Sequence, residues 1–329
     1  MELDIIIIGA GPAGLNMARA AAEAGAKYLI IEKESVGGAW SKIRSEVPML
    51  SPATPQVDWT SLPGLDIWKI GCKRPFPTCG DFLNYLEAYA KKFDLNIEEN
   101  TEVVTVTRLG EDGFEVVTGK GKHNTRRVVA ATGIISNPYI PENLKGRPGV
   151  VHSIDVKNPR DYEGKSVIVL GAGNSAAETA IALSGWTREL VMAHPGPIKF
   201  HSETKQMEHI RGASESLLKE LFIFDLVRHM PDSVMESYDG KTARLSGRKV
   251  EADNVITATG FRPHIDFLEN SNLKLKRKGR FPAVNMRLES ISEPGIFFTG
   301  SLTNIFPYSN FIHGFREDPN GIDLNPEML

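Results

Sequence analysis

The chain has 329 residues, enough for about two domains, and a formal net charge of −3. Hydrophobic residues make up 41% and charged residues 24%, a balance typical of globular proteins. The small acidic excess argues against a protein that binds nucleic acid through charge. No apolar run reaches the roughly 20 residues of a membrane span, and only two cysteines are present. We therefore expect a globular, cytoplasmic protein without a disulfide framework.

The N-terminal segment predicts a buried strand, a glycine-rich turn and a helix. Residues 5–8 are four consecutive isoleucines, typical of a strand covered on both faces of a parallel sheet. Residues 9–14 follow as Gly-Ala-Gly-Pro-Ala-Gly, a spacing that lets the backbone approach a pyrophosphate. A second strand is expected over residues 27–31, and Glu32 at its end can accept hydrogen bonds from a ribose. A tight turn with nothing bound is the alternative, but all the parts of a dinucleotide-binding unit occur here in order.

A long proline-rich segment follows this unit. Residues 41–80 show no periodicity, and the aromatic residues within them favour an ordered wall of a site over a disordered loop. Cys72 and Cys79 lie in this segment with a wider spacing than the C-x-x-C of redox pairs, so a redox role is disfavoured. Residues 81–93 have the apolar spacing of an amphipathic helix whose aromatic stripe belongs to the core.

The chain then repeats its opening pattern. Residues 166–170 predict another buried strand, and residues 171–176 follow as Gly-Ala-Gly-Asn-Ser-Ala. A further strand ends just before His194, which stands at the same distance from the first glycine of its turn as Glu32 does in the first unit. Two dinucleotide units in one chain call for two dinucleotides.

The repeat also predicts how the domains are connected. Ala-Thr-Gly occurs at residues 131–133 and again at residues 258–260, each time after an apolar strand. The match indicates that the second unit is inserted into the first. The expected fold class is α/β, with two nested, three-layer Rossmann-like nucleotide-binding domains. Residues 1–150 and 264–329 would form one nucleotide-binding domain, and residues 151–263 the other.

On these motifs the sequence resembles the two-dinucleotide-binding-domain flavoproteins. Within them it is most similar to the flavin-containing monooxygenases, with the thioredoxin-reductase-like branch second. The motifs that carry the resemblance are residues 9–14, Gly-Gly-Ala-Trp at residues 37–40, the helix segment from Pro77 to Phe93, Ala-Thr-Gly at residues 131–133, and His152-Ser153 leading to residues 171–178. The resemblance covers nearly the whole chain and weakens after residue 300. It implies FAD as the bound cofactor and a nicotinamide nucleotide as the reductant. By the same resemblance, residues 1–150 and 264–329 would be the FAD-binding domain and residues 151–263 the NAD(P)H-binding domain.

The resemblance assigns cofactor-binding roles to the matching positions. For FAD these are Gly9, Gly11, Pro12, Ala13, Gly14, Glu32, Lys33, Gly38, Trp40, Val103, Ala131, Thr132, Gly133, Gly300 and Ser301. For the nicotinamide nucleotide they are Gly171, Gly173, Asn174, Ser175, Ala176, His194 and Lys199. No metal site is expected.

The choice of nicotinamide cofactor depends on the residue that follows the second strand of the second nucleotide unit. A carboxylate there would accept from a free 2′-hydroxyl and repel a 2′-phosphate, but this chain has His194. Lys199 and His201 follow closely and supply positive charge, which Glu203 partly offsets. We expect NADPH, with NADH tolerated. The alternative is that Lys199 is simply solvated.

The chain departs from the monooxygenase pattern at several positions. The asparagine that supports oxygen chemistry in such enzymes aligns near Ser51, and the last strand ends in Gly300-Ser301 where the wider family has Gly-Asp. The helix expected after Phe311 would be broken by Pro319. Ser51 and His313 are the polar candidates for catalysis, with a surface or capping role as the alternative for each.

Three functions are compatible with these observations. The first is a monooxygenase that uses NAD(P)H and O2 and acts on a small organic substrate through a C4a-(hydro)peroxyflavin. The second is a reductase of a disulfide, a quinone or an electron-transfer protein, working without its own C-x-x-C. The third is a non-enzymatic flavin or nucleotide sensor. The first is the prediction; a homodimer is left open, and no nucleic acid or membrane partner is expected.

Overall fold

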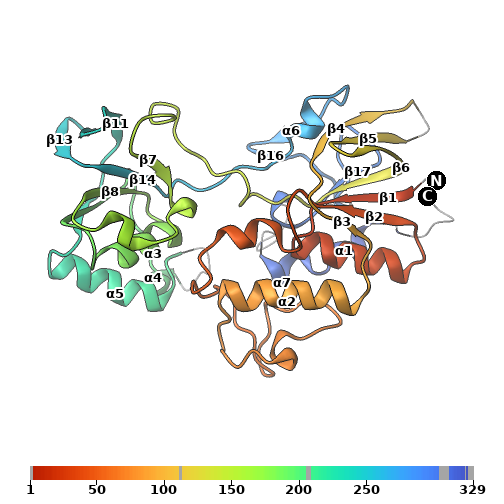
Figure 1. Cartoon of the computed structure of the whole chain (residues 1–329), viewed down its shortest axis with the longest axis horizontal. Coiled ribbons are helices and arrows are strands. Elements are labelled where there is room, and N and C mark those ends of the chain that lie inside the picture. Colours follow the sequence, from red (N-terminus) through yellow and green to blue (C-terminus); the bar gives the residue numbers. More distant parts are fainter. Residues whose placement is uncertain (1–2, 111–112, 205–208, 304–310, 323, 325–329) are drawn as a thin grey trace. The chain divides into compact units, whose positions relative to one another are not determined.

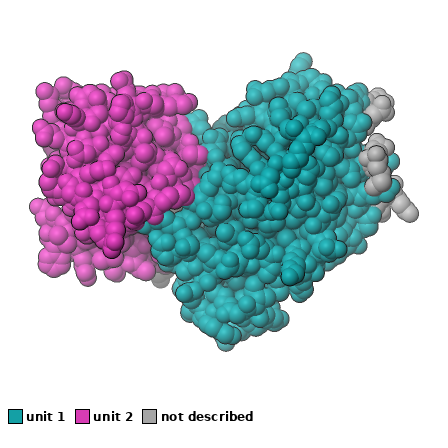
Figure 2. Space-filling model, viewed as in Figure 1, with its two compact units in different colours: residues 1–137, 262–329 teal, residues 138–261 magenta. Residues whose placement is uncertain are grey.

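The computed structural model describes residues 3–110, 113–204, 209–303, 311–322 and 324 (Figure 1). The chain forms two compact units, unit 1 from residues 1–137 and 262–329 and unit 2 from residues 138–261 (Figure 2). Unit 2 is therefore inserted into unit 1 along the chain. With a parallel sheet core in each unit, the predicted α/β fold of two nested Rossmann-like domains is confirmed. The cofactor assigned to each unit stays a prediction.

Unit 1 is built on a seven-stranded sheet with the order β3-β2-β1-β6-β5-β4, and β17 also pairs with β6. β1 pairs parallel with β2 and β6, β2 with β3, and β6 with β17. β5 pairs antiparallel with both β4 and β6. In the register of the central strands, Ile6 lies opposite Leu29 on one side and Val128 on the other. The strands are β1 (Leu3–Ile8), β2 (Tyr28–Ile31), β3 (Ile97–Glu98), β4 (Val103–Arg108), β5 (Phe114–Thr118), β6 (Gly121–Ala130) and β17 (Ile296–Phe298).

The two faces of this sheet are covered by different layers (Figure 1). Ile5 and Ile7 of β1 pack in the cluster formed by α1 (Pro12–Glu23) and α2 (Cys79–Lys92). Ile6 and Ile8 pack in the cluster on the other face, which includes Leu268 of α6 (Asp266–Glu269). All four isoleucines are at most 4% exposed, because successive side chains of a strand point to opposite faces and both faces are covered.

Helix α2 begins two residues before its predicted start and holds the proline-rich segment in place. Thr78 and Asp81 form a reciprocal capping box: Thr78 Oγ1 accepts from the Asp81 N–H at 3.1 Å, and Asp81 Oδ2 accepts from the Thr78 N–H at 2.9 Å. The Tyr85 hydroxyl accepts from the Leu62 N–H at 2.6 Å, and the Tyr89 hydroxyl donates to the Pro63 carbonyl at 2.8 Å. The segment is therefore ordered by buried tyrosines of its neighbouring helix.

Unit 2 has a five-stranded parallel sheet with helices on one face and a small antiparallel sheet on the other. Its strand order is β10-β9-β8-β14-β7. The strands are β7 (Val150–His152), β8 (Ser166–Leu170), β9 (Glu189–Ala193), β10 (Arg228–Met230) and β14 (Asn254–Thr257). The helices are α3 (Asn174–Leu183), α4 (His201–Thr204) and α5 (Gly212–Ile223), and the small sheet is β11 (Met235–Tyr238), β12 (Thr242–Leu245) and β13 (Arg248–Glu251).

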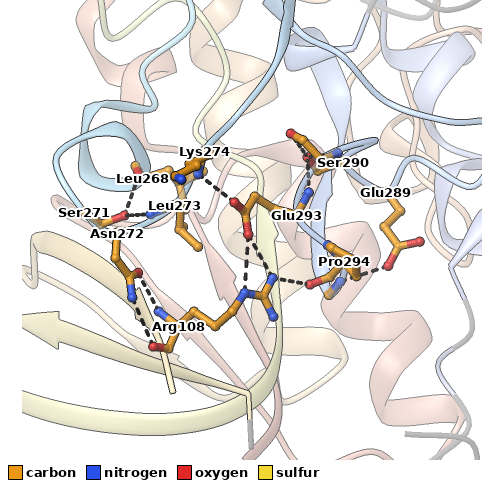
Figure 3. Close-up of polar contacts among 12 residues, drawn as sticks. Arg108, Leu268, Ser271, Asn272, Leu273, Lys274, Glu289, Ser290, Glu293 and Pro294 are labelled. Atoms are coloured by element: carbon orange, nitrogen blue, oxygen red, sulfur yellow. Dashed lines mark hydrogen bonds and ion pairs between the residues drawn. The ribbon is translucent and has the colours of Figure 1, made fainter. Parts of the chain in front are cut away.

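Residues 262–329 return to unit 1 after unit 2, and we call them the returning chain. A polar network holds the returning chain against Arg108 at the end of β4 (Figure 3). Arg108 donates from Nη2 to the Glu293 carboxylate at 3.1 Å and to the Pro294 carbonyl at 2.6 Å. The side chain of Asn272 bonds both backbone groups of Arg108, at 3.0 and 3.3 Å. The second oxygen of Glu293 accepts from the Lys274 N–H at 2.6 Å. β15 (Arg277–Lys278), β16 (Phe281–Pro282), α6 and β17 all belong to this returning part.

Candidate functional site

The first glycine turn, between β1 and α1, is closed against the protein on two sides and open on a third. Gly9 has φ +107°, and a Cβ there would lie 2.8 Å from the carbonyl oxygen of Ala131. A Cβ on Gly14 would lie 1.9 Å from the carbonyl oxygen of Gly9, so α1 approaches the strand closely only because this residue is glycine. Gly11, the N-cap of α1, has no atom within 4 Å of its Cβ position. The open side is the N-terminus of a helix, which favours an anion.

Glu32 lies at the end of β2 with its carboxylate against this turn. Its Oε2 accepts from the Ala10 N–H at 2.6 Å and its Oε1 accepts from the Glu34 N–H at 2.9 Å. Burial raises the pKa of Glu32, although these two hydrogen bonds oppose the shift. Each carboxylate oxygen can accept a second hydrogen bond, so Glu32 retains capacity for the hydroxyls of a ribose.

The ends of β6 and β17 lie at the same edge of the sheet as the first glycine turn. The Ala131 N–H donates to the Ile8 carbonyl at 2.8 Å. A Cβ on Gly133 would lie 3.2 Å from Ser301 Oγ, and a Cβ on Gly300 would lie 2.7 Å from the Cβ of Ala13. Segments that are far apart in the chain thus meet at the carboxyl edge of the sheet, where open α/β folds bind their ligands.

The remaining positions predicted for FAD have these surroundings. Thr132 Oγ1 donates to the carbonyl of His264 at 2.6 Å. Lys33 forms an exposed ion pair with Glu102 at 2.6 Å.

The 3-10 turn Gly38–Lys42 lies between Glu32 and helix α2. Trp40 packs edge-on against Phe82 of α2, with ring centroids 4.8 Å apart. A Cβ on Gly38 would lie 3.3 Å from Oε2 of Glu32. Val103 begins β4 and is buried. Pro12 and Ala13 open α1. Their roles toward FAD stay predictions.

Asp318 was not singled out by the sequence, yet its carboxylate reaches the end of β17. Oδ2 accepts from Thr299 Oγ1 at 2.6 Å and from the Gly300 N–H at 3.0 Å. Burial raises the pKa of Asp318 to about 6, although both hydrogen bonds oppose the shift. The helix after Phe311 ends at Phe315, and Pro319, expected to interrupt it, lies in the following 3-10 turn Asp318–Gly321. No local pattern marks Asp318, because its partners lie 18 or more residues earlier in the chain.

His313, one of the two catalytic candidates, lies in an aromatic cluster of unit 1. It belongs to the single-turn helix α7 (Ile312–Phe315). Its ring centroid is 5.3 Å from that of Trp59 and 5.9 Å from that of Phe311. Burial, followed by the positive charge of Arg316, lowers the pKa of His313. The imidazole is therefore neutral at pH 7 and suited to accept or share a proton.

Ser51, the other candidate, is 4% exposed, and its carbonyl accepts from Thr60 Oγ1 at 3.1 Å. Arg316 joins the loop of Ser51 to α7 and α1. Its Nη1 donates to the carbonyls of Asp58 and Ser61 at 3.3 and 3.5 Å, and its carbonyl accepts from Asn16 Nδ2 at 2.8 Å. The structure therefore brings the segments of both candidates together beside α1. Their catalytic roles stay predictions.

The second glycine turn repeats the geometry of the first within unit 2. Gly171 has φ +145°, and a Cβ there would lie 2.4 Å from the carbonyl oxygen of Ala258. Gly173, the N-cap of α3, has no atom within 4 Å of its Cβ position. Asn174 Nδ2 donates to the His209 carbonyl at 2.9 Å, and its Oδ1 accepts from the Arg211 N–H at 3.1 Å. Its side chain therefore positions the segment before α5, a long-range role that the motif does not reveal.

The other residues predicted for the second turn differ in exposure. Ser175 is exposed at the start of α3, whereas Ala176 is fully buried. Lys199 is exposed. His194 is 1% exposed, and both of its ring nitrogens have partners within unit 2: the Gly196 carbonyl and His229 Nε2.

Two further groups bear on the chemistry. Cys79 is the first residue of α2 and 4% exposed, and Cys72 lies in the loop before it. Within the described ranges, no three His, Cys, Asp or Glu side chains are grouped so as to hold a metal ion. The same part of the chain contains no helix of the length and apolarity needed to cross a bilayer.

Known proteins resemble this chain over nearly its whole length, including both glycine turns. The model of the family described as pyridine nucleotide-disulphide oxidoreductase matches residues 6–300. An uncharacterized CzcO-like oxidoreductase of Geobacillus kaustophilus is 29% identical over 91% of this chain and 90% of its own. The bacillithiol disulfide reductase of Staphylococcus aureus has a TM-score of 0.86 at 20% identity, covering 100% of this chain and 98% of its own. The flavin-containing monooxygenase of Stenotrophomonas maltophilia has a TM-score of 0.81 at 23% identity, covering 97% and 96%. At these identities the two structures establish a common fold.

Proposed function

The chain belongs to the pyridine nucleotide-disulphide oxidoreductase family of flavin-dependent enzymes, and we propose that it binds FAD in unit 1 and a nicotinamide nucleotide in unit 2. One observation carries this proposal: the same turn is built twice. Gly9 and Gly171 close each turn against a backbone carbonyl, and Gly11 and Gly173 leave the N-termini of α1 and α3 open. Each open helix terminus can receive a pyrophosphate.

The residues of unit 1 fit FAD. Gly11 leaves room for a pyrophosphate, and Glu32 presents a buried carboxylate with unused acceptor capacity for a ribose. The bound flavin would supply the electron transfer, and the chain binds and orients it. In unit 2 the reductant is NADPH, with NADH tolerated, because no carboxylate follows β9 and Lys199 is exposed nearby.

We further propose that the enzyme is a monooxygenase acting with O2 on a small organic substrate. The chain has two cysteines and no C-x-x-C, so it lacks the closely spaced dithiol that usually receives electrons from the flavin in disulfide reductases. The aromatic rings of Trp59 and Phe311 lie beside the neutral His313, so an apolar surface meets an imidazole that can accept a proton. Water exclusion and control of one proton are what such a site needs from the protein.

A second candidate is a reductase of a diffusible disulfide, a quinone or an electron-transfer protein. It is favoured by the likeness in fold to a bacillithiol disulfide reductase over nearly the full length of both chains. Such an acceptor would need no cysteine pair in this chain.

One experiment separates the two candidates. Purified protein with FAD and NADPH is assayed for O2 uptake and peroxide release, with and without a panel of thioethers and amines. A monooxygenase is expected to release less peroxide than the O2 it consumes when a substrate is present, and to form the oxygenated product. Stoichiometric peroxide with every compound, together with rapid reduction of a disulfide or quinone, would favour the reductase.

A further inference from the structure

In unit 2, His194 and His229 form a hydrogen-bonded imidazole pair at the end of β9. The backbone of His194 is held on both sides: its N–H donates to the Met230 carbonyl at 3.3 Å, and its carbonyl accepts from the Ser233 N–H at 2.9 Å. Its ring Nε2 lies 2.8 Å from Nε2 of His229, and its Nδ1 bonds to the Gly196 carbonyl. His194 is buried, whereas His229, on β10, is exposed.

These contacts assign the protons of the pair. A carbonyl oxygen only accepts, so Nδ1 of His194 carries a hydrogen and Nε2 of the neutral ring is an acceptor. Nε2 of His229 must then donate, which leaves Nδ1 of His229 as the acceptor of the pair. One added proton on His229 Nδ1 keeps every hydrogen bond. A second would set two N–H groups against each other at 2.8 Å, so the pair holds at most one extra proton.

The surroundings keep His229 of the free pair neutral at pH 7. The His229 ring stacks on Phe222 of α5, with centroids 4.3 Å apart and planes at 5°. Burial, followed by the neighbouring His194, lowers the pKa of His229. The charged residues on the elements around the pair are Glu189, Lys199, Glu215, Lys219, Glu220, Arg228 and Asp232. Four of these neutralise one another, as Arg228 pairs with Glu189 at 3.2 Å and Lys219 with Glu215 at 2.6 Å.

The place of the pair indicates what it meets. In a Gly-x-Gly nucleotide unit, the residue after the second strand lies at the 2′ position of the adenosine ribose. β9 is that strand in unit 2, and His194 follows it directly. We propose that His194 and His229 form a one-proton pair that binds a 2′-phosphate together with a proton taken from solvent. His229 makes the contact, and His194 is the positioning residue. This inference rests on the proposed function, because it needs a nucleotide in unit 2.

The pair would treat the two nicotinamide cofactors differently. Neutral His229 offers an acceptor at Nδ1, which suits the 2′-hydroxyl of NADH and needs no added proton. Protonated His229 offers a positively charged N–H, which suits the 2′-phosphate of NADPH. Binding of the phosphorylated form is thus linked to uptake of one proton, and its Kd rises about tenfold for each pH unit above the pKa of the free pair.

Calorimetric titration of the purified full-length protein tests this linkage. The probes are 2′,5′-ADP and 5′-AMP, which share the 5′-phosphate and differ only at the 2′ position. Above about pH 7 the 2′-phosphate is already a dianion, since phosphate monoesters titrate near pH 6. Between about pH 7 and 9, the Kd of 2′,5′-ADP is expected to rise about tenfold per unit while that of 5′-AMP stays constant. Two buffers of different ionisation enthalpy should report close to one proton taken up.

Two variants locate the effect. His229→Gln should weaken 2′,5′-ADP binding at the lower pH and make its Kd independent of pH. His123→Gln, which removes a histidine of unit 1 bonded to Glu98, is the matched control and should change nothing. Binding of 2′,5′-ADP with a Kd that does not change with pH would contradict the proposed proton uptake by the His194–His229 pair. So would a pH dependence of this Kd that persists in His229→Gln. Either result would leave the proposed nucleotide site of unit 2 standing. If neither probe binds, the proposed function of unit 2 fails, and the inference fails with it.

Discussion

Among single residues, Glu32 makes the most specific contribution to the proposed FAD site. Glu32→Gln keeps the size of the side chain but replaces one carboxylate oxygen with an NH2 donor and removes the charge. One backbone N–H, of Ala10 or Glu34, then loses its acceptor, and so does the ribose hydroxyl that we propose binds the same oxygen. Hydrogen bonds to charged groups contribute about 1.5–3 kcal/mol, so FAD affinity should fall roughly 10- to 150-fold. Fluorescence titration of the apoprotein with FAD measures this. Glu102→Gln, at an exposed acid paired with Lys33, is the control and should have no effect. An unchanged affinity in Glu32→Gln would exclude the ribose role.

Asp318 gives a pH dependence of stability with a defined sign. Its pKa of about 6 lies above the ordinary value of 3.8, so the folded protein holds the proton more tightly than the unfolded chain does. This contribution to the free energy of unfolding is fully present below about pH 4 and is lost as the pH rises through 6. Asp318→Asn keeps an acceptor for Thr299 and Gly300 without the buried charge. Relative to wild type, the free energy of unfolding of Asp318→Asn should be roughly 1–3 kcal/mol higher at pH 8 and unchanged at pH 4. Urea unfolding at both pH values measures the difference, and a less stable variant at pH 8 would contradict the account.

Among the elements, helix α1 offers two glycines that separate folding from binding. A Cβ on Gly14 would collide with the carbonyl oxygen of Gly9 at 1.9 Å, so Gly14→Ala should cost about 1–3 kcal/mol of stability or more. Gly11 has an ordinary φ of −73° and open space around it. Gly11→Ala should therefore fold with a stability within about 1 kcal/mol of wild type, while its methyl group blocks the approach of a pyrophosphate. Thermal unfolding and FAD titration measure the two effects. An FAD affinity unaltered by Gly11→Ala would argue against the site.

The strand–turn–helix elements could be predicted because their signals are local. The isoleucines of β1 stand next to one another, and the glycines of each turn stand within a few positions of one another. The Thr78–Asp81 capping box is local too but is not part of the sequence prediction, and α2 begins two residues before its predicted start. The partners of Asp318, His194 and Asn174 could not be predicted, because those contacts join residues 18 to 37 positions apart. Asn174 shows the limit: its motif predicts a ligand contact but does not reveal that its amide also holds the segment before α5.

At the scale of the whole molecule, unit 1 depends on contacts between its two segments, residues 1–137 and 262–329. Glu293 is 9% exposed, and its carboxylate accepts from Arg108 and from the Lys274 N–H. Glu293→Gln would place an amide donor against one of these donors, which should lower the free energy of unfolding by about 1–3 kcal/mol. Lys122→Gln removes an exposed ion pair with Glu115 and should cost at most about 1 kcal/mol. Urea unfolding followed by tryptophan fluorescence compares the two, and equal effects would show that the network does not fasten the returning chain.

Because each glycine turn lies within its own unit, the two proposed cofactor sites can be disabled separately. Gly11 opens the turn of unit 1 and Gly173 that of unit 2, with the same empty surroundings at each Cβ position. Blocking the first should remove FAD. Blocking the second should leave FAD in place and remove only the reductant.

Anaerobic reduction of the purified protein by NADPH, followed through the visible absorbance of bound flavin, tests the central claim most directly. We predict one FAD per chain that NADPH bleaches in the wild type. Gly173→Ala should keep its FAD but lose reduction at the same NADPH concentration, while dithionite still reduces it. A colourless protein that takes up no FAD, or a Gly173→Ala variant that NADPH reduces as fast as the wild type, would contradict the account.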